Sequence, residues 1–237
     1  MSAYTEIKNN PGRIARYIDH TDVSPMSTAR EIKKLCTEAN KYSFYSVIVL
    51  PYYVKLAKSL TKSKVGVVIG FPFGVQSTKA KIDEIKEVYN YADEFDIVIN
   101  RAAFENKDYK YVLGELKKIR KVIGRKIMKV IIESPELSNY EIKKASEIVL
   151  ASGADFVKTA VGIKGFAKIN HVMIMKKVVK NKIKVKASSG IRTFEQALSF
   201  IKAGADRIGT SYGVKIVNEA LGKNHKNNKE QKKLEGY

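Results

Sequence analysis

The sequence predicts a single α/β domain folded as a (β/α)8 TIM barrel. Short runs rich in β-branched residues recur about every 20 to 30 residues, and each is followed by an amphipathic stretch that ends at Gly or Asn. There are eight such units, and 237 residues are enough for one barrel. A doubly wound open sheet would alternate in the same way, but no G-x-G-x-x-G motif follows the first predicted strand.

The eight predicted strands are short and mostly apolar, as expected for parallel strands that are covered on both faces. They span residues 16–19, 46–50, 65–69, 95–99, 127–132, 155–158, 183–187 and 207–209.

Capping boxes predict where three of the helices begin, because two side chains three residues apart satisfy free amides at a helix start. The pairs are Thr28 with Glu31, Ser138 with Glu141, and Thr193 with Gln196. Apolar residues recur at helical spacing behind each box. Gly153 and Gly204 then stand where a left-handed residue would end a helix. Cys36 falls on an apolar helix face, and we expect it to be a small core residue.

Composition excludes several classes of protein. One cysteine cannot form an internal disulfide, and three scattered histidines show no zinc-ligand spacing. The longest apolar run, residues 65–75, is far shorter than the roughly 18 residues of a membrane span. The N-terminus has no continuous apolar segment of a secretory signal, so we expect a cytoplasmic protein. Residues 1–221 are expected to form the barrel, and residues 222–237, with five lysines, a polar tail.

The formal net charge of +20 favours phosphorylated or polyanionic partners. Lys, Asn, Ile and Tyr are abundant together along the whole chain, which is typical of an AT-rich coding bias. A nucleic-acid-binding protein would instead cluster its basic residues on one face with aromatic residues placed for stacking. We therefore expect no sequence-specific nucleic-acid binding, although it remains the alternative to an enzyme.

Four ionisable residues interrupt apolar strands: Asp96, Lys129, Lys158 and Lys186. Burying an ammonium group is costly, and a buried lysine usually responds with a lowered pKa. A neutral amine is what a Schiff base with a carbonyl compound requires. Any one of the lysines could instead extend its stem to a strand end or pair with a carboxylate. The three lysines lie at or near the C-terminal strand ends, where barrel active sites are found.

Small and hydroxyl-bearing residues follow the sixth, seventh and eighth predicted strands, in residues 159–165, 188–193 and 209–213. Small residues let backbone amides approach an anion, and the next helix N-terminus adds a favourable dipole. Phosphate often binds at these loops in barrels. The three segments together predict a phosphate site.

At these residues the sequence resembles the deoxyribose-phosphate aldolase family of class I, Schiff-base aldolases. The resemblance extends from Ile18 to about Gly213. The matching motifs are Ile18-Asp-His-Thr21, Gly70-Phe-Pro-Phe-Gly74 with Thr78, Lys81 and Glu84, Asp96-Ile-Val-Ile-Asn100, Lys129-Val-Ile-Ile-Glu133, Ala151-Ser-Gly-Ala-Asp-Phe-Val-Lys-Thr159, Lys186-Ala-Ser-Ser-Gly-Ile-Arg-Thr193 and Gly204-Ala-Asp-Arg-Ile-Gly-Thr-Ser211.

The resemblance implies reversible cleavage of 2-deoxy-D-ribose 5-phosphate to glyceraldehyde 3-phosphate and acetaldehyde, without metal or cofactor. Lys158 matches the lysine that forms the Schiff base, Lys186 the lysine that lowers its pKa, and Asp96 the acid/base that works with a bound water. The matching substrate-binding positions are Lys129, Thr159, Gly162, Gly190 and Ser211. A terminal tyrosine that folds back as a proton relay would be Tyr237. We expect a homo-oligomer such as a dimer. A related barrel aldolase acting on another sugar phosphate is the alternative within enzymes.

Four positions depart from the family pattern. Ser189-Gly190 stands where a glycine pair is common, and Tyr212 follows Ser211 where a second serine is frequent. Leu50 replaces a polar residue, and Arg101-Ala102 replaces a hydrophobic-Gly pair. Since Lys158, Lys186 and Asp96 are retained, we expect these departures to affect phosphate affinity and substrate preference before the chemistry.

Overall fold

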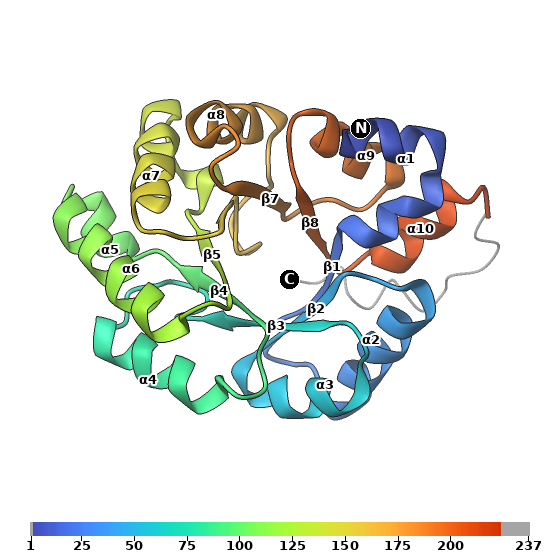
Figure 1. Cartoon of the computed structure of the whole chain (residues 1–237), viewed down its shortest axis with the longest axis horizontal. Coiled ribbons are helices and arrows are strands. Elements are labelled where there is room, and N and C mark those ends of the chain that lie inside the picture. Colours follow the sequence, from blue (N-terminus) through green and yellow to red (C-terminus); the bar gives the residue numbers. More distant parts are fainter. Residues whose placement is uncertain (1, 224–237) are drawn as a thin grey trace.

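The computed structural model describes residues 2–223, and its eight parallel strands form one closed barrel in chain order (Figure 1). The predicted (β/α)8 fold is confirmed, and closure of β8 onto β1 excludes a doubly wound open sheet. The strands are β1 Ile18–Asp22, β2 Ser46–Val49, β3 Lys64–Ile69, β4 Glu94–Val98, β5 Ile127–Ile131, β6 Phe156–Lys158, β7 Lys184–Ser188 and β8 Arg207–Thr210.

The helices form a ring around the strands, as Figure 1 shows. They are α1 Ala3–Asn9, α2 Ala29–Tyr42, α3 Val54–Leu60, α4 Thr78–Val88, α5 Arg101–Glu105, α6 Tyr109–Ile123, α7 Asn139–Ala151, α8 Ile169–Val179, α9 Phe194–Lys202 and α10 Gly213–Ala220. Short 3-10 helices are η1 Pro11–Tyr17, η2 Pro51–Tyr53 and η3 Ser134–Glu136. The N-terminal α1 packs against α9, and η1 packs against α10, so the start of the chain covers the last part of the ring.

Seven of the predicted strands agree with the structure to within one residue at each end. The first prediction, residues 16–19, was wrong, because the strand spans Ile18–Asp22. Pro11 begins the 3-10 helix η1, which continues to Tyr17 and buries Ile14 and Ala15. Arg16 therefore belongs to a helical turn and is exposed.

The local signals for helix ends are confirmed. All three predicted capping boxes form, at the starts of α2, α7 and α9. Gly153 and Gly204 follow α7 and α9 with φ of 80° and 109°, a region that glycine enters without a steric penalty. Cys36 is buried in the core, and burial raises the pKa of its thiol to about 11, so the thiol stays protonated and unreactive at neutral pH.

None of the helices within residues 2–223 is both long enough and apolar enough to cross a membrane. Residues 224–237 lie outside the described part of the chain. They include most of the segment expected to be a polar tail, and also Tyr237.

Candidate active site

Neighbouring strands bring the predicted charged residues to one level of the barrel interior. Asp96 of β4 is opposite Lys129 of β5, and Lys158 of β6 is opposite Lys186 of β7. The Nζ atoms of Lys158 and Lys186 lie 2.8 Å and 2.9 Å from Oδ2 of Asp96. The Nζ atom of Lys129 lies 2.9 Å from the other oxygen, Oδ1. The structure thus gathers all four residues around one carboxylate.

Three further buried charges belong to the same group, and sequence reasoning missed them. Oδ2 of Asp19 in β1 forms an ion pair with Nζ of Lys186 at 2.6 Å, and Oδ1 of Asp19 accepts a hydrogen bond from Arg207 of β8 at 2.8 Å. Glu94 of β4 accepts from Lys129 at 2.5 Å. We call the seven residues the barrel charge cluster: Asp19, Glu94, Asp96, Lys129, Lys158, Lys186 and Arg207. Two of the three missed residues could have been found from the sequence, because Asp19 and Arg207 are charged residues within predicted strands.

The cluster holds four basic and three acidic residues, and each residue is at most 5% exposed. With every group ionised, the cluster has one more positive charge than negative charges. An uncompensated charge in a buried site is expensive, so the cluster favours the loss of one proton from an amine. Arginine does not give up its proton in proteins, which leaves the three lysines.

Lys158 is the lysine that gives up this proton. Burial lowers the pKa of Lys158 to about 8, and the nearby charges of Lys186 and Lys129 add to that effect against the attraction of Asp96. Burial also disfavours the charged form of Lys129, but Asp96 and Glu94 outweigh it and raise the pKa of Lys129. About a tenth of Lys158 is therefore a neutral amine at pH 7, far more than for a lysine with the usual pKa of 10.5.

Asp96 stays ionised. Burial alone would raise the pKa of this carboxyl, but Lys129, Lys158 and Lys186 together hold it well below its usual value. A carboxylate with such a low pKa is a poor proton donor at neutral pH. It can still orient a water molecule or stabilise a developing positive charge.

Exposure separates Lys158 from the other two lysines. Its side chain is 6% exposed, whereas the side chains of Lys129 and Lys186 are 0% exposed. Lys158 is the last residue of β6, at the C-terminal end of the barrel, where the predicted phosphate loops begin. Among the three, it is the amine that a molecule entering from this end can reach.

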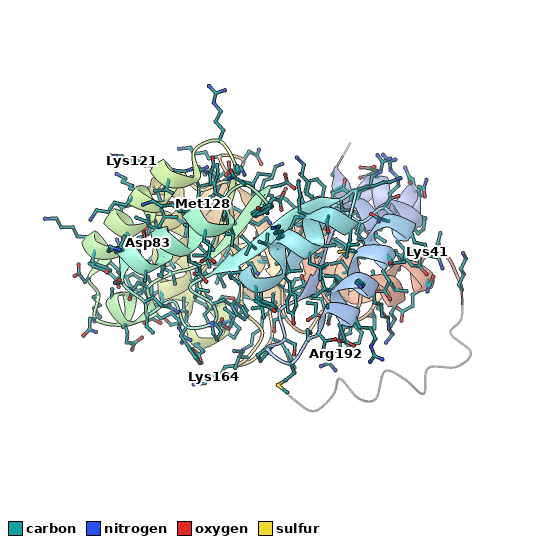
Figure 2. All side chains as sticks on the ribbon, turned by 90° about the horizontal axis from the view of Figure 1, so that it is seen from below. Lys41, Asp83, Lys121, Met128, Lys164 and Arg192 are labelled. Carbon is teal, nitrogen blue, oxygen red and sulfur yellow. The ribbon has the colours of Figure 1, made fainter. Side chains whose placement is uncertain are left out.

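The loops after β6 and β7 are tied together beside Lys158. The Thr159 hydroxyl donates to the Ser188 carbonyl at 2.9 Å and accepts from the Ser188 amide at 2.8 Å. The Ser189 hydroxyl donates to the Gly165 carbonyl at 2.9 Å. Figure 2 shows Lys164 and Arg192, one from each loop, on the same side of the molecule and Lys121 on the opposite side.

The backbone conformation of these loops explains why glycine occurs in them. Gly162 and Gly190 have φ of 101° and 77°. A Cβ atom on Gly190 would lie 2.7 Å from the ring of Phe166, so no larger residue fits there without moving that ring. Ser189 also has a positive φ, 86°, which explains why a glycine is common at its position in the family that the chain resembles.

The candidate substrate-binding residues fall into two groups. Gly162, Gly190 and Ser211 lie in the loops, where their surfaces are at least partly exposed. Lys129 and Thr159 are 0% exposed, and their polar atoms are engaged by Asp96 and Ser188. The structure gives those two residues supporting positions beneath the loops.

Glu133, just after β5, is a further buried carboxyl near Lys158. Its Oε2 accepts from the Val161 amide at 2.8 Å, which fixes the start of the loop after β6. Its Oε1 is buried without a hydrogen-bond partner within residues 2–223. Burial raises the pKa of this carboxyl. The sequence analysis included Glu133 in a family motif but predicted no role for it.

Two of the departures from the family pattern lie at the rim of these loops. Arg101 forms an ion pair with Glu136, whose other oxygen is 3.7 Å from Lys164 of the loop after β6. The ring of Tyr212 lies 5.4 Å from the Arg192 guanidinium, a cation–π distance. Nothing in the structure explains Leu50. Within residues 2–223, no group of three or more His, Cys, Asp or Glu side chains is arranged to hold a metal ion.

Comparison with known proteins agrees with this geometry. The family model described as DeoC/LacD family aldolase matches residues 13–219. The chain is 51% identical over 214 residues to deoxyribose-phosphate aldolase of Caldicellulosiruptor saccharolyticus, covering 87% of this chain and 97% of that protein.

Solved structures give the same result. The aldolase QR15 matches with a TM-score of 0.85 and 43% identity, covering 88% of this chain and 96% of that one. Deoxyribose phosphate aldolase of Aeropyrum pernix, described as a tetramer, matches with a TM-score of 0.82 and 30% identity, covering 92% and 95%. The resemblance inferred from the motifs is confirmed. The sequence identity to known aldolases, the barrel fold and the match to the family model together show that this chain belongs to the DeoC/LacD family of aldolases.

Proposed function

We propose that the chain reversibly cleaves 2-deoxy-D-ribose 5-phosphate to D-glyceraldehyde 3-phosphate and acetaldehyde through a Schiff base on Lys158. The observation that carries the proposal is that Lys158 combines a pKa lowered to about 8 with a side chain reachable from the C-terminal end of the barrel. The names of the relatives support the substrate. The reaction belongs to deoxyribose phosphate breakdown, and we propose a cytoplasmic location for it.

The neutral Lys158 amine attacks the aldehyde carbon C1 of the open-chain sugar, and loss of water gives a protonated imine. Removal of the proton on the C3 hydroxyl breaks the C2–C3 bond, and its electron pair moves towards the imine nitrogen. Glyceraldehyde 3-phosphate leaves, and the enamine that remains takes a proton at C2. Hydrolysis then releases acetaldehyde and regenerates the amine. The imine accepts the electron pair, so this route uses neither a metal ion nor another cofactor.

Asp96 and Lys186 serve the proton steps in this proposal. Because Asp96 is buried and ionised, we assign it to holding a water that carries the proton between the C3 hydroxyl and C2. Lys186, 2.9 Å from the same carboxylate, keeps Lys158 partly neutral and takes part in the proton exchange around Asp96. Lys129 holds the opposite oxygen of Asp96 in place.

The loops supply the phosphate site. The backbone amides at Gly162 and Gly190 and the hydroxyl of Ser211 are assigned to the phosphate oxygens, because positive-φ glycines and a helix start expose donors. Thr159 keeps the loops after β6 and β7 together. The excess positive charge assists the capture of a phosphorylated substrate, and we propose no specific nucleic-acid partner.

Two parts of the proposal rest on relatives. We propose a homo-oligomer, such as a dimer, because the Aeropyrum pernix relative is described as a tetramer. Tyr237, which lies outside the described residues, is proposed as a proton relay on the family resemblance alone. Tyr237→Phe should slow deuterium exchange into the methyl group of acetaldehyde, followed by NMR, more than it raises KM. Equal exchange rates would remove Tyr237 from the mechanism.

Borohydride trapping tests the central step. Incubation with acetaldehyde and borohydride should reduce the imine to a stable amine, and peptide mass analysis should place the adduct on Lys158. Lys158→Ala should form no adduct, while Lys164→Ala, which removes an exposed lysine from the same loop region, should form it normally. An adduct on another lysine, or trapping by Lys158→Ala at the wild-type rate, would overturn the assignment. Comparing turnover of other sugar phosphates tests the substrate separately.

A further inference from the structure

A cavity of about 540 Å³ opens at the N-terminal end of the barrel, opposite the loops of the candidate active site. Its walls come from residues at or before the starts of β1, β2, β7 and β8, together with α1 and η1. Four of the lining side chains are basic: Arg13, Arg16, Lys184 and Arg207. This end of a barrel normally contributes to stability alone, so a basic cavity there needs an explanation.

Two acidic residues also line the cavity, but other groups already satisfy them. Glu6 accepts from Arg13 at 2.6 Å and from the Tyr17 hydroxyl at 2.7 Å. Asp206 accepts from Lys176 at 3.0 Å and from the Val185 amide at 2.9 Å. The two carboxylates therefore contribute little to neutralising the remaining cations of the cavity.

Arg16 and Lys184 are the cations left over. Neither side chain makes a hydrogen bond or an ion pair with any residue in the range 2–223. Both are exposed, so neither needs a partner for burial, and each is free to turn towards a bound group. With four basic and two acidic side chains in its lining, the cavity has an excess of two positive charges, which matches the charge of a phosphate monoester at neutral pH.

Arg207 provides a fixed donor in the same cavity. It is 5% exposed, its Nη1 donates to Asp19 at 2.8 Å, and its guanidinium carbon lies 3.3 Å from the centre of the Tyr45 ring. A guanidinium held on both sides has little rotamer freedom left to lose when it binds a ligand. Its planar arrangement of N–H donors suits phosphate oxygens.

We propose that this cavity is a second binding site, separate from the catalytic one, for a small molecule that carries a phosphate monoester. The volume is in the range of sites for sugar- or nucleotide-sized ligands, and is larger than a phosphate group alone requires. Arg16 and Lys184 close on the phosphate, and Arg207 holds it from the barrel side. Arg207 belongs to both the cavity lining and the barrel charge cluster, but neither Lys158 nor the glycine loops take part, so the proposal for this cavity does not rest on the proposed reaction.

Isothermal titration calorimetry at low ionic strength tests the proposal, with adenosine 5′-monophosphate as the probe and adenosine as its uncharged counterpart. The wild type should bind the monophosphate and not adenosine. Arg16→Ala combined with Lys184→Ala should weaken binding about tenfold or more, because two charge-assisted contacts are lost. Lys117→Ala with Lys118→Ala removes the same charge from exposed positions on α6, and it should leave the affinity unchanged.

The control variants distinguish this cavity from the catalytic loops. If the monophosphate binds at those loops instead, the Arg16/Lys184 variant will keep the wild-type affinity, and the proposal is overturned. An absence of binding by the wild type, or equal binding of adenosine, overturns it too. Borohydride trapping on Lys158 should stay normal in the Arg16/Lys184 variant, because both substitutions lie at the opposite end of the barrel.

Discussion

Lys158 and Lys186 face each other in the register of β6 and β7, and their Nζ atoms share one oxygen of Asp96, at 2.8 Å and 2.9 Å. Two ammonium groups so close to one oxygen disfavour each other's charge. Burial is the larger cause of the lowered pKa of Lys158, and Lys186 adds to it. The fraction of neutral Lys158 near pH 7 therefore depends on the charge of Lys186.

Replacing Lys186 by leucine should raise the pKa of Lys158 above its value of about 8. The substitution removes a cation that repels protonated Lys158. Asp96 then has one ammonium group fewer beside it, so it stabilises protonated Lys158 more strongly. Both effects favour the protonated form of Lys158. The rising limb of the imine-trapping rate should move to higher pH by about one unit or more. Borohydride trapping from pH 6 to 10 measures the shift.

Lys186→Arg is the matched control, since it keeps the positive charge while changing the shape of the donor. Its trapping profile should stay closer to that of the wild type than the profile of Lys186→Leu does. An unshifted profile for Lys186→Leu, with full turnover, would show that Lys186 does not tune Lys158.

Lys158 should also lower the free energy of unfolding at neutral pH. Its pKa is lowered from 10.5 to about 8, so between these values the unfolded chain binds more protons than the folded one, and stability rises with pH. Below pH 8 the full penalty remains, about 3 kcal/mol at 1.4 kcal/mol per pKa unit. Lys158→Met should unfold at a higher urea concentration than the wild type at pH 7.

The pH dependence of that difference is the stricter test. The stability advantage of Lys158→Met should shrink as the pH approaches 10, where wild-type Lys158 is neutral in the folded protein. Lys164→Met, an exposed lysine, should show no such pH dependence. A constant difference between Lys158→Met and the wild type from pH 7 to pH 10 would contradict the lowered pKa.

Asp96→Asn should separate imine formation from turnover. Loss of the carboxylate removes the group that favours protonated Lys158, so the amine stays available and trapping should persist at pH 7. Turnover should fall about 10²- to 10⁴-fold, the usual contribution of a positioned acid/base group. Trapping and turnover are measured on the same preparation.

Stability must be followed alongside, because the buried lysines lose a carboxylate partner. Breaking a buried ion pair costs about 3–5 kcal/mol, so the assays belong well below the melting temperature of the variant. If turnover stays within a few-fold of the wild type, Asp96 is a structural ion-pair partner and the proposed proton relay fails.

The sequence predicted the limits of β2 to β8 and missed those of β1, the most polar strand. The runs that form β2 to β5 are rich in Val and Ile, and the limits of all strands from β2 to β8 were found to within one residue. β1 reads Ile-Asp-His-Thr-Asp, and four of its five residues are polar. Asp19 belongs to the barrel charge cluster, so a polar residue is required at this position. The strand therefore lacks the hydrophobic pattern by which strands are predicted.

The same contrast explains which charged residues the sequence revealed. Lys158 stood out because it interrupts an apolar run, whereas Asp19 lies in a polar strand and Glu94 at the very start of one. The predicted barrel implies that β8 closes on β1, but the sequence does not show that this closure brings Arg207 and Asp19 within 2.8 Å. The basic cavity likewise arises from residues of four strand starts that are far apart in the chain.

Ser189 provides a test of how the phosphate loops are held. Its φ of 86° costs a non-glycine residue about 1–2 kcal/mol, and its hydroxyl donates to the Gly165 carbonyl at 2.9 Å, a bond that contributes about 1 kcal/mol. Ser189→Ala keeps the strain and loses the bond, so it should be about 1 kcal/mol less stable than the wild type in urea unfolding.

Ser189→Gly loses the same bond but removes the strain, while the extra freedom of its unfolded chain offsets part of that gain. Its stability should therefore lie near that of the wild type and above that of Ser189→Ala. Both variants remove one of the bonds between the loop after β6 and the loop after β7. KM for 2-deoxyribose 5-phosphate should therefore rise, whereas activity towards unphosphorylated 2-deoxyribose should not change. Ser189→Ala as stable as the wild type would mean that the hydroxyl bond contributes nothing. Equal effects on both substrates would show that Ser189 supports the barrel in general and does not shape the phosphate site.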